Sequence, residues 1–308
     1  MVKRLKLHFD ENPISLALIA LLFGGVCIGF SPIFVRLSET GPTSSAFWRV
    51  LLVLPLFYMT MVRNTNKRIK NGENVTAFKF SKKIWWGLTL SGFLFAADLA
   101  FWHSALQYTT VANATLLSNL MPILVAVGAH FLFKEHLTPV FYMGLALALI
   151  GAVVLAGNGS GQGRLLGDGL AVVTAVFYGA YILSVRWLRR DVGTSAIMFW
   201  TGVVSVVFLL PLAVATGEVV LPTSAYGWYI LFGLAFISQF VGQGLITYSL
   251  AHLPAAFGAV SLLVQPVVAA ALAWNIFGEA LGPWEFLGAT VILTGIVLAR
   301  LGAVPKPT

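Results

Sequence analysis

Three ionisable side chains interrupt apolar stretches of this sequence and are the first candidates for chemistry. Arg49 lies in the run over 43–63, while Asp98 and His103 both lie in the run over 84–106. A charged group near the centre of a bilayer costs roughly 3 kcal/mol on insertion scales, so each needs a partner or a polar cavity. Counting along the helices places Arg49 and Asp98 at matching depths. We expect either a structural ion pair between them or a gating, proton-linked role for Asp98.

His103 titrates near neutral pH when it is unperturbed, so it is a candidate for binding a solute or relaying a proton. A packed, hydrogen-bonded histidine is the alternative. Asp98 and His103 are five residues apart, about 140° around a helix. We therefore expect only one of the two to face a cavity, and the other to belong to the scaffold.

Amide, hydroxyl and aromatic side chains recur at helical spacing in the other apolar stretches, for example Gln239, Gln243 and Thr247. Lipid does not tolerate such a stripe, so it must face the protein interior, where it either binds a solute or bonds neighbouring helices. The candidate solute-binding residues are Ser31, Trp102, His103, Thr115, Asn119, Tyr178, Tyr181, Gln239, Gln243 and Gln265.

Pro122 and Pro266 lie within apolar runs and are candidate hinges. Because proline has no amide hydrogen, each should free a carbonyl four residues earlier, at Ser118 and Leu262, for a ligand. A kink that serves packing alone explains both prolines equally well.

The composition requires lipid as the solvent. The chain has 308 residues, of which 58% are hydrophobic and 10% charged. Runs long enough to cross a bilayer, about 20 residues each, recur between short polar breaks. The expected spans are 14–37, 43–63, 84–106, 111–133, 137–156, 168–188, 194–214, 226–249, 254–276 and 283–301. We therefore predict an all-α polytopic membrane protein with ten transmembrane helices.

Basic residues predict the orientation, because cytoplasmic loops retain lysine and arginine. With the N-terminus inside, most of them fall on the cytoplasmic side and only Arg36 and Arg164 on the other. Both termini should then be cytoplasmic, in what we expect to be a bacterial inner membrane. The same placement explains the formal charge of +8 and argues against nucleic-acid binding.

The second half of the chain repeats the first. At an offset of 144 positions, Pro122 meets Pro266, and a Phe-x-Glu-x-Leu-x-Pro segment starting at Phe133 meets another starting at Phe277. This divides the chain into residues 1–157 and 158–308, with five spans each. An odd number of spans inverts the second half, which is typical of transporters with alternating access.

Glu135 and Glu279 end helices before prolines, so we interpret them as structural. The pairs Gly144 with Gly151 and Gly288 with Gly295 predict close packing of the fifth and tenth helices, within one chain or between protomers.

Three motifs of the first half are distinctive: Phe47-Trp48-Arg49, Ala97 to His103, and Val111 to Leu117 followed by Asn119-x-x-Pro122. In these motifs the sequence resembles the EamA-type transporters of the drug/metabolite transporter superfamily. The resemblance implies a central cavity lined by helices 1, 3, 4, 6, 8 and 9, and a small-metabolite substrate such as an amino acid. It selects no particular substrate.

The function expected from all of this is a secondary transporter that exports small metabolites, with amino acids or related neutral or zwitterionic solutes favoured over other metabolites or drugs. The sequence lacks a Gly-x4-Gly-Lys-Ser/Thr loop, so an electrochemical gradient must supply the energy. An intramembrane enzyme is disfavoured because no paired carboxylates, metal-binding histidine cluster or Ser/Lys dyad converges at one depth, and a channel because this chain supplies two halves itself. We expect no cofactor and no metal, and a lipid-embedded homodimer or monomer.

Overall fold

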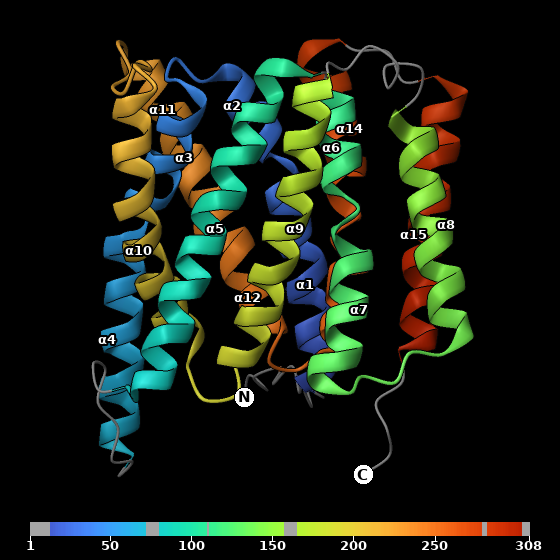
Figure 1. Ribbon diagram of the computed structural model, residues 1–308, viewed down its shortest axis with the longest axis horizontal. Helices are drawn as coiled ribbons and strands as arrows, with labels where there is room; N and C mark the ends of the chain where they lie inside the picture. The colour runs from blue at the N-terminus through green and yellow to red at the C-terminus, as the bar shows by residue number, and fades with distance from the viewer. Residues whose placement is uncertain (1–12, 72–79, 110, 157–164, 279–281, 304–308) are drawn as a thin grey trace, which may run out of the picture.

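The protein is a bundle of helices, described here by a computed structural model over residues 13–71, 80–109, 111–156, 165–278 and 282–303 (Figure 1). The described helices are α1 (Pro13–Gly29), α2 (Ser31–Leu37), α3 (Pro42–Leu51), α4 (Leu54–Lys70), α5 (Lys82–Tyr108), α6 (Val111–Ser118), α7 (Met121–Phe133), α8 (Pro139–Ala156), α9 (Leu165–Leu188), α10 (Thr194–Ala215), α11 (Ala225–Gly233), the π-helix η2 (Leu234–Gln243), α12 (Gly244–Ser249), α13 (Ala255–Ser261), α14 (Val264–Phe277) and α15 (Pro283–Gly302).

Eight helical units among the described residues are long and apolar enough to cross a membrane. They are Pro13–Leu37, Pro42–Lys70, Lys82–Tyr108, Leu165–Leu188, Thr194–Ala215, Ala225–Ser249, Ala255–Phe277 and Pro283–Gly302. Two of the ten expected spans fall short of that length, at Met121–Phe133 and Pro139–Leu155. The first is short because the chain between α6 and α7 breaks the helix. The ten-span inverted repeat therefore stays a prediction.

Several spans are interrupted just before a proline. Pro32, Pro55 and Pro122 each stand at the first or second position of α2, α4 and α7, where proline's missing N–H is not needed. Pro266 is the third residue of α14. The expectation of a freed carbonyl was wrong at Leu262, because the chain tightens there and the Leu262 oxygen accepts a bond from the Gln265 N–H at 2.9 Å.

The polarity of the bundle is that of a membrane protein, with polar groups inside and large apolar side chains outside. Arg49 is 4% exposed, Asp98 7% and Gln243 1%, whereas Trp86 is 70% and Phe131 76% exposed. Burial of charge with exposure of aromatics is the reverse of a soluble core, and it fits a surface that faces lipid.

Helices α8 and α15 lie side by side at one edge of the bundle (Figure 1), in contact along both glycine pairs. A Cβ added at Gly151 would lie 2.6 Å from the Ile292 nitrogen, and one added at Gly288 would lie 2.5 Å from the Leu155 nitrogen. Only glycine permits backbones this close. The two glycine pairs therefore pack against each other within one chain.

At the end of the bundle where α3 and α11 begin, two carboxylates bond across the halves. Glu218 accepts the Ser44 N–H at 3.0 Å and the Thr43 hydroxyl at 2.9 Å, at the start of α3. Glu39 accepts the Ser224 hydroxyl and the Ser224 N–H, at the start of α11. The bond from the Ser224 hydroxyl is the main cause that lowers the pKa of Glu39. These carboxylates satisfy helix-terminal donors that would otherwise be unpaired.

At the opposite end, Glu135 does the same for α13. Its two carboxylate oxygens accept the N–H groups of Ala255 at 2.7 Å and Ala256 at 3.2 Å. The residue before it, Lys134, ends α7 in the left-handed conformation at φ 54°, and its repeat mate Gly278 ends α14 at φ 67°. Corresponding positions of the two halves thus share the same helix stop. Glu279, the mate of Glu135, lies outside the described residues.

Helix α1 begins and α15 ends at the same end of the bundle (Figure 1). The side of the membrane on which that end lies, and with it the expected cytoplasmic termini, stays a prediction.

The glycine contact between α8 and α15 predicts opposite effects for two alanine substitutions. Gly151→Ala should lower the thermal midpoint of the purified protein, because the new methyl group meets Ile292 backbone, and overpacking costs about 1–3 kcal/mol. Gly169→Ala on α9, where a Cβ would meet no described atom within 4 Å, should hold or raise the midpoint. Equal midpoints for the two variants would contradict the close contact.

Candidate solute-binding cavity

A cavity of about 90 Å³ lies inside the bundle, between helices of both halves. One water needs about 10–15 Å³ of such volume, so the cavity has room for several waters or one small organic solute. The predicted site residues that line it are Ser31, Arg49, Asp98, Trp102, Thr115, Asn119, Pro122, Tyr178, Gln243, Gln265 and Pro266. His103, Tyr181 and Gln239 are not among the lining residues.

The cavity lies near the middle of the bundle along its axis. The α5 residues that line it, from Phe95 to Trp102, run from the midpoint of α5 to about 9 Å from its end, at 1.5 Å per residue. On α9, Thr174 lies about 14 Å from the start of the helix and Tyr178 about 15 Å from its end.

Arg49 lies at the cavity wall and is held by hydrogen bonds to side chains of two other helices. Its Nε donates to Gln239 Oε1 on η2 at 3.0 Å, and its Nη1 donates to Ser31 Oγ on α2 at 2.9 Å. These bonds go to neutral groups rather than to Asp98, so the expected direct ion pair is replaced by a network. Asp98 lines the same cavity and attracts Arg49 through space.

One face of α5 forms a wall of the cavity. Phe95, Asp98, Leu99 and Trp102 all line it, and their spacing of three and four residues is that of a single helix face. His103 points elsewhere. It is fully buried, and its ring packs edge-on against Trp102 with centroids 5.1 Å apart. The ring lies close to the Pro42 backbone, but neither nitrogen makes a well-aligned hydrogen bond among the described residues.

Two tyrosines of α9 take different positions. Tyr178 lines the cavity, and its hydroxyl reaches Gln265 of α14. Tyr181 is fully buried behind it and stacks on Phe95 with ring centroids 4.7 Å apart. Tyr181 therefore supports the aromatic wall from outside the cavity.

The two glutamines of the predicted stripe lie on the π-helix η2, where a regular α-helix was expected. Gln239 is 2% exposed and accepts the bond from Arg49, while Gln243 is 1% exposed and lines the cavity. Ser238 on the same helix donates to the Cys27 carbonyl of α1 at 3.2 Å. π-helical turns are uncommon and often mark functional sites. Here the π-helix carries both the support of Arg49 and a cavity amide.

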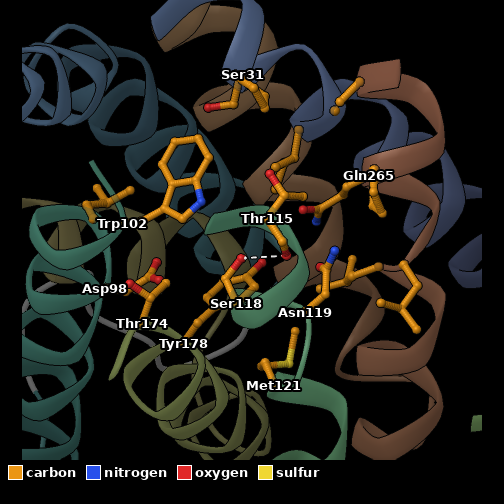
Figure 2. A pocket seen from close by; sticks show the side chains of 18 of the residues that line it. Ser31, Asp98, Trp102, Thr115, Ser118, Asn119, Met121, Thr174, Tyr178 and Gln265 are labelled. Carbon is orange, nitrogen blue, oxygen red and sulfur yellow. Dashed lines mark hydrogen bonds between the residues drawn. The ribbon is translucent and has the colours of Figure 1, made fainter. Parts of the chain in front are cut away.

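Three amide nitrogens of cavity-lining residues make no well-aligned hydrogen bond among the described residues, although the hydroxyls of Tyr178 and Tyr181 lie close to two of these amides. They are Asn119 Nδ2, Gln243 Nε2 and Gln265 Nε2, which we call the amide cluster. Figure 2 shows Asn119 and Gln265 on one side of the cavity and Asp98 and Trp102 on the other. Buried donors are almost always paired in folded proteins, so a cluster of unpaired ones at a cavity is a feature to explain.

Several lining residues escaped the sequence analysis. Phe95 and Leu99 could have been found from Asp98, since they occupy the same face of α5. Met121 and Ser118 gave no comparable signal, because the break between α6 and α7 changes the helical phase there.

A second recess lies toward the end of the bundle where α4 ends, between α4, the start of α10, and α12. Its volume is about 840 Å³, and its lining includes Asn64, Arg68, Arg189 and Tyr248. Among the described residues, no group of three or more histidine, cysteine or acidic side chains is placed to hold a metal ion.

The profile of the EamA-like transporter family matches residues 15–157 and 165–301, most of both halves. The chain belongs to the EamA-like transporter family. With the eight apolar spans, this makes it an integral membrane protein of the transporter class.

Similar proteins carry names of the same kind. The chain is 26% identical to a probable terminal-alkyne amino-acid exporter of Streptantibioticus cattleyicolor, over 62% of this chain and 64% of that protein. It is 22% identical to a pseudopaline exporter of Pseudomonas aeruginosa, over 69% and 74%. A solved crystal structure superposes with a TM-score of 0.75 at 19% identity, covering 94% of this chain and 98% of that one, which shows the fold.

The network around Arg49 predicts that Gln239→Leu is far more damaging than a substitution at His103. Leucine keeps the volume but removes the acceptor of a buried charged donor, which costs about 1.5–3 kcal/mol. We expect a lower thermal midpoint and lost transport. His103→Phe removes no well-aligned hydrogen bond, only a contact with the Pro42 backbone outside the cavity, so its midpoint and transport should stay much nearer the parent's. Equal losses in both variants would contradict these assignments.

Proposed function

We propose that this protein is a secondary transporter that exports amino acids or related zwitterionic solutes by alternating access through the cavity. The observation that carries the proposal is that one arginine and one aspartate, Arg49 and Asp98, line a single buried cavity between the halves. Their charges cancel, so the cavity is suited to a solute that also carries one charge of each sign.

The size and lining of the cavity support a small organic solute. Around the charges lie Phe95, Leu99, Trp102 and Tyr178, which give an apolar surface for a side chain. Binding sites for small molecules commonly combine such a surface with a few polar groups that fix orientation. The relative named as an amino-acid exporter supports the same substrate class.

Alternating access is supported by the way the two halves meet. Polar bonds join them at both ends, through Glu39 and Glu218 at one end and through Glu135 at the other. Two similar halves of opposite orientation can exchange conformations, opening a site between them to each side in turn. We propose ten spans for this purpose, with α6 and α7 together forming the fourth and α8 the fifth. Ion gradients or solute exchange supply the energy.

We also propose that both termini are cytoplasmic, in a bacterial inner membrane, as the basic residues favour. The second recess, beside Arg68 and Arg189, then lies on the cytoplasmic side.

A monomer is the proposed functional unit. Both halves of the cavity come from one chain, and the glycine pairs that suggested helix packing between protomers are occupied within the chain by α8 and α15. A homodimer would add no residue to the cavity.

The proposal predicts saturable uptake of amino acids by liposomes that contain the purified protein. A pool of labelled amino acids is offered with and without an imposed pH gradient. Acceleration by the gradient would establish proton coupling, and equal saturable uptake would establish exchange or facilitated diffusion.

Asp98→Asn should abolish most of this uptake, because the carboxylate that balances Arg49 is lost while the volume is kept. His103→Phe, equally buried but off the cavity, is the matched control. Uptake no greater than in empty liposomes for every pool member would overturn the amino-acid proposal and favour other metabolites or drugs.

A further inference from the structure

We infer that the amide cluster, Asn119, Gln243 and Gln265, binds the carboxylate of the transported solute, while Asp98 receives its ammonium group. This inference rests on the proposed function and goes beyond it by assigning each end of the solute to a wall of the cavity. The α-carboxylate then becomes the group that decides which solutes are carried.

The unpaired nitrogens supply the first argument. All three are donors on residues that line the cavity, and none makes a well-aligned hydrogen bond among the described residues, although tyrosine hydroxyls lie close to Gln265 and Gln243. The hydroxyl of Tyr178 lies close to the Gln265 amide and that of Tyr181 close to the Gln243 amide, so a bound solute replaces these contacts. Donors without acceptors favour a ligand rich in acceptor oxygens, and a carboxylate offers two oxygens with about four lone-pair sites.

Charge supplies the second argument. Arg49 already donates hydrogen bonds from Nε to Gln239 and from Nη1 to Ser31, so these two groups are not available to bind a solute. Asp98 on the opposite wall repels dianions such as phosphate esters. A monoanionic group facing the amide cluster, with a cation facing Asp98, gives the three amides and Asp98 partners of suitable sign. Figure 2 shows the two walls facing each other, with Asn119 and Gln265 opposite Asp98.

The origin of the amides supplies the third argument. Asn119 follows α6 in the first half, whereas Gln243 and Gln265 belong to η2 and α14 in the second. A carboxylate held by all three would bond the halves together. Each nitrogen exposes less than 1 Å² in this conformation, so side-chain rotation must accompany binding. Solute binding is thereby coupled to rearrangement at the break between α6 and α7 and at the start of α14.

The test uses labelled leucine and three competitors that differ by one group. These are 3-methylbutylamine, which lacks the carboxylate, 4-methylpentanoate, which lacks the ammonium group, and leucinamide. For the parent protein in liposomes, unlabelled leucine should compete best and 3-methylbutylamine at least tenfold less well. Replacing a donor to a charged group should weaken leucine about tenfold to a hundredfold in Gln265→Leu and Asn119→Leu.

The ratio between competitors is the decisive readout, because a damaged fold would weaken all of them alike. In Gln265→Leu the preference for leucine over 3-methylbutylamine should disappear, and in Gln243→Glu it should reverse in favour of the amine. Asn275→Leu removes an exposed amide from the same helix, α14, and should keep the parent's ratios. Variants that retain the parent's ratios would overturn the carboxylate assignment while leaving the proposed function intact. A parent that carries no amino acid would overturn both.

Discussion

A guanidinium buried inside an apolar bundle is the constraint on which this structure depends. Arg49 cannot be hydrated where it lies, so its charge must be satisfied by the protein, and uncompensated burial would cost several kcal/mol. The charge is stabilised by hydrogen bonds to Ser31 and Gln239 and by attraction to the Asp98 carboxylate. They come from α2, η2 and α5, so meeting the needs of one side chain fixes the relative positions of helices from both halves. The cavity is the space that remains between them.

The same constraint explains why the polar interior keeps a cavity and is not completely hydrogen-bonded. Asp98 attracts Arg49 without bonding it directly, and the nitrogens of the amide cluster make no well-aligned hydrogen bond among the described residues. Burying unpaired donors costs free energy that a folded protein can recover only by binding something or by rearranging. A transporter needs such an imbalance, because a site that is fully satisfied when empty gains little from its solute. The helix breaks before Pro122 and Pro266 lie next to two of these amides, so the segments best able to rearrange are the ones that carry them.

The sequence predicted the parts of this arrangement that depend on counting along intact helices. Depth measured from helix ends placed Arg49 and Asp98 together, and helical phase required that only one of Asp98 and His103 face a cavity. The family resemblance and the repeat pointed to a transporter of two related halves, and the family was confirmed. The site residues themselves stay a prediction, although most of them meet at one cavity.

What the sequence missed depended on long-range contacts and on departures from regular helices. Gln239 is 190 residues from Arg49, so nothing local marks it as the arginine's partner. The π-helix that carries it has a different periodicity from an α-helix, and a stripe drawn with α-helical spacing treats Gln239 and Gln243 as equivalent. At Leu262, the chain closes a tight turn that uses the carbonyl expected to be free. Short apolar helices such as α7 also obscure the number of spans.

The central claim is that a single zwitterionic solute binds between Asp98 and the amide cluster. The most direct measurement is a structure of the protein determined with selenomethionine as the added solute, using the anomalous signal of selenium to locate it in protein that contains ordinary methionine. The account predicts one selenium peak against the aromatic wall of the cavity, near Trp102 and Tyr178. A peak only in the recess beside Arg68 and Arg189, or no peak while the same preparation transports that solute, would contradict it.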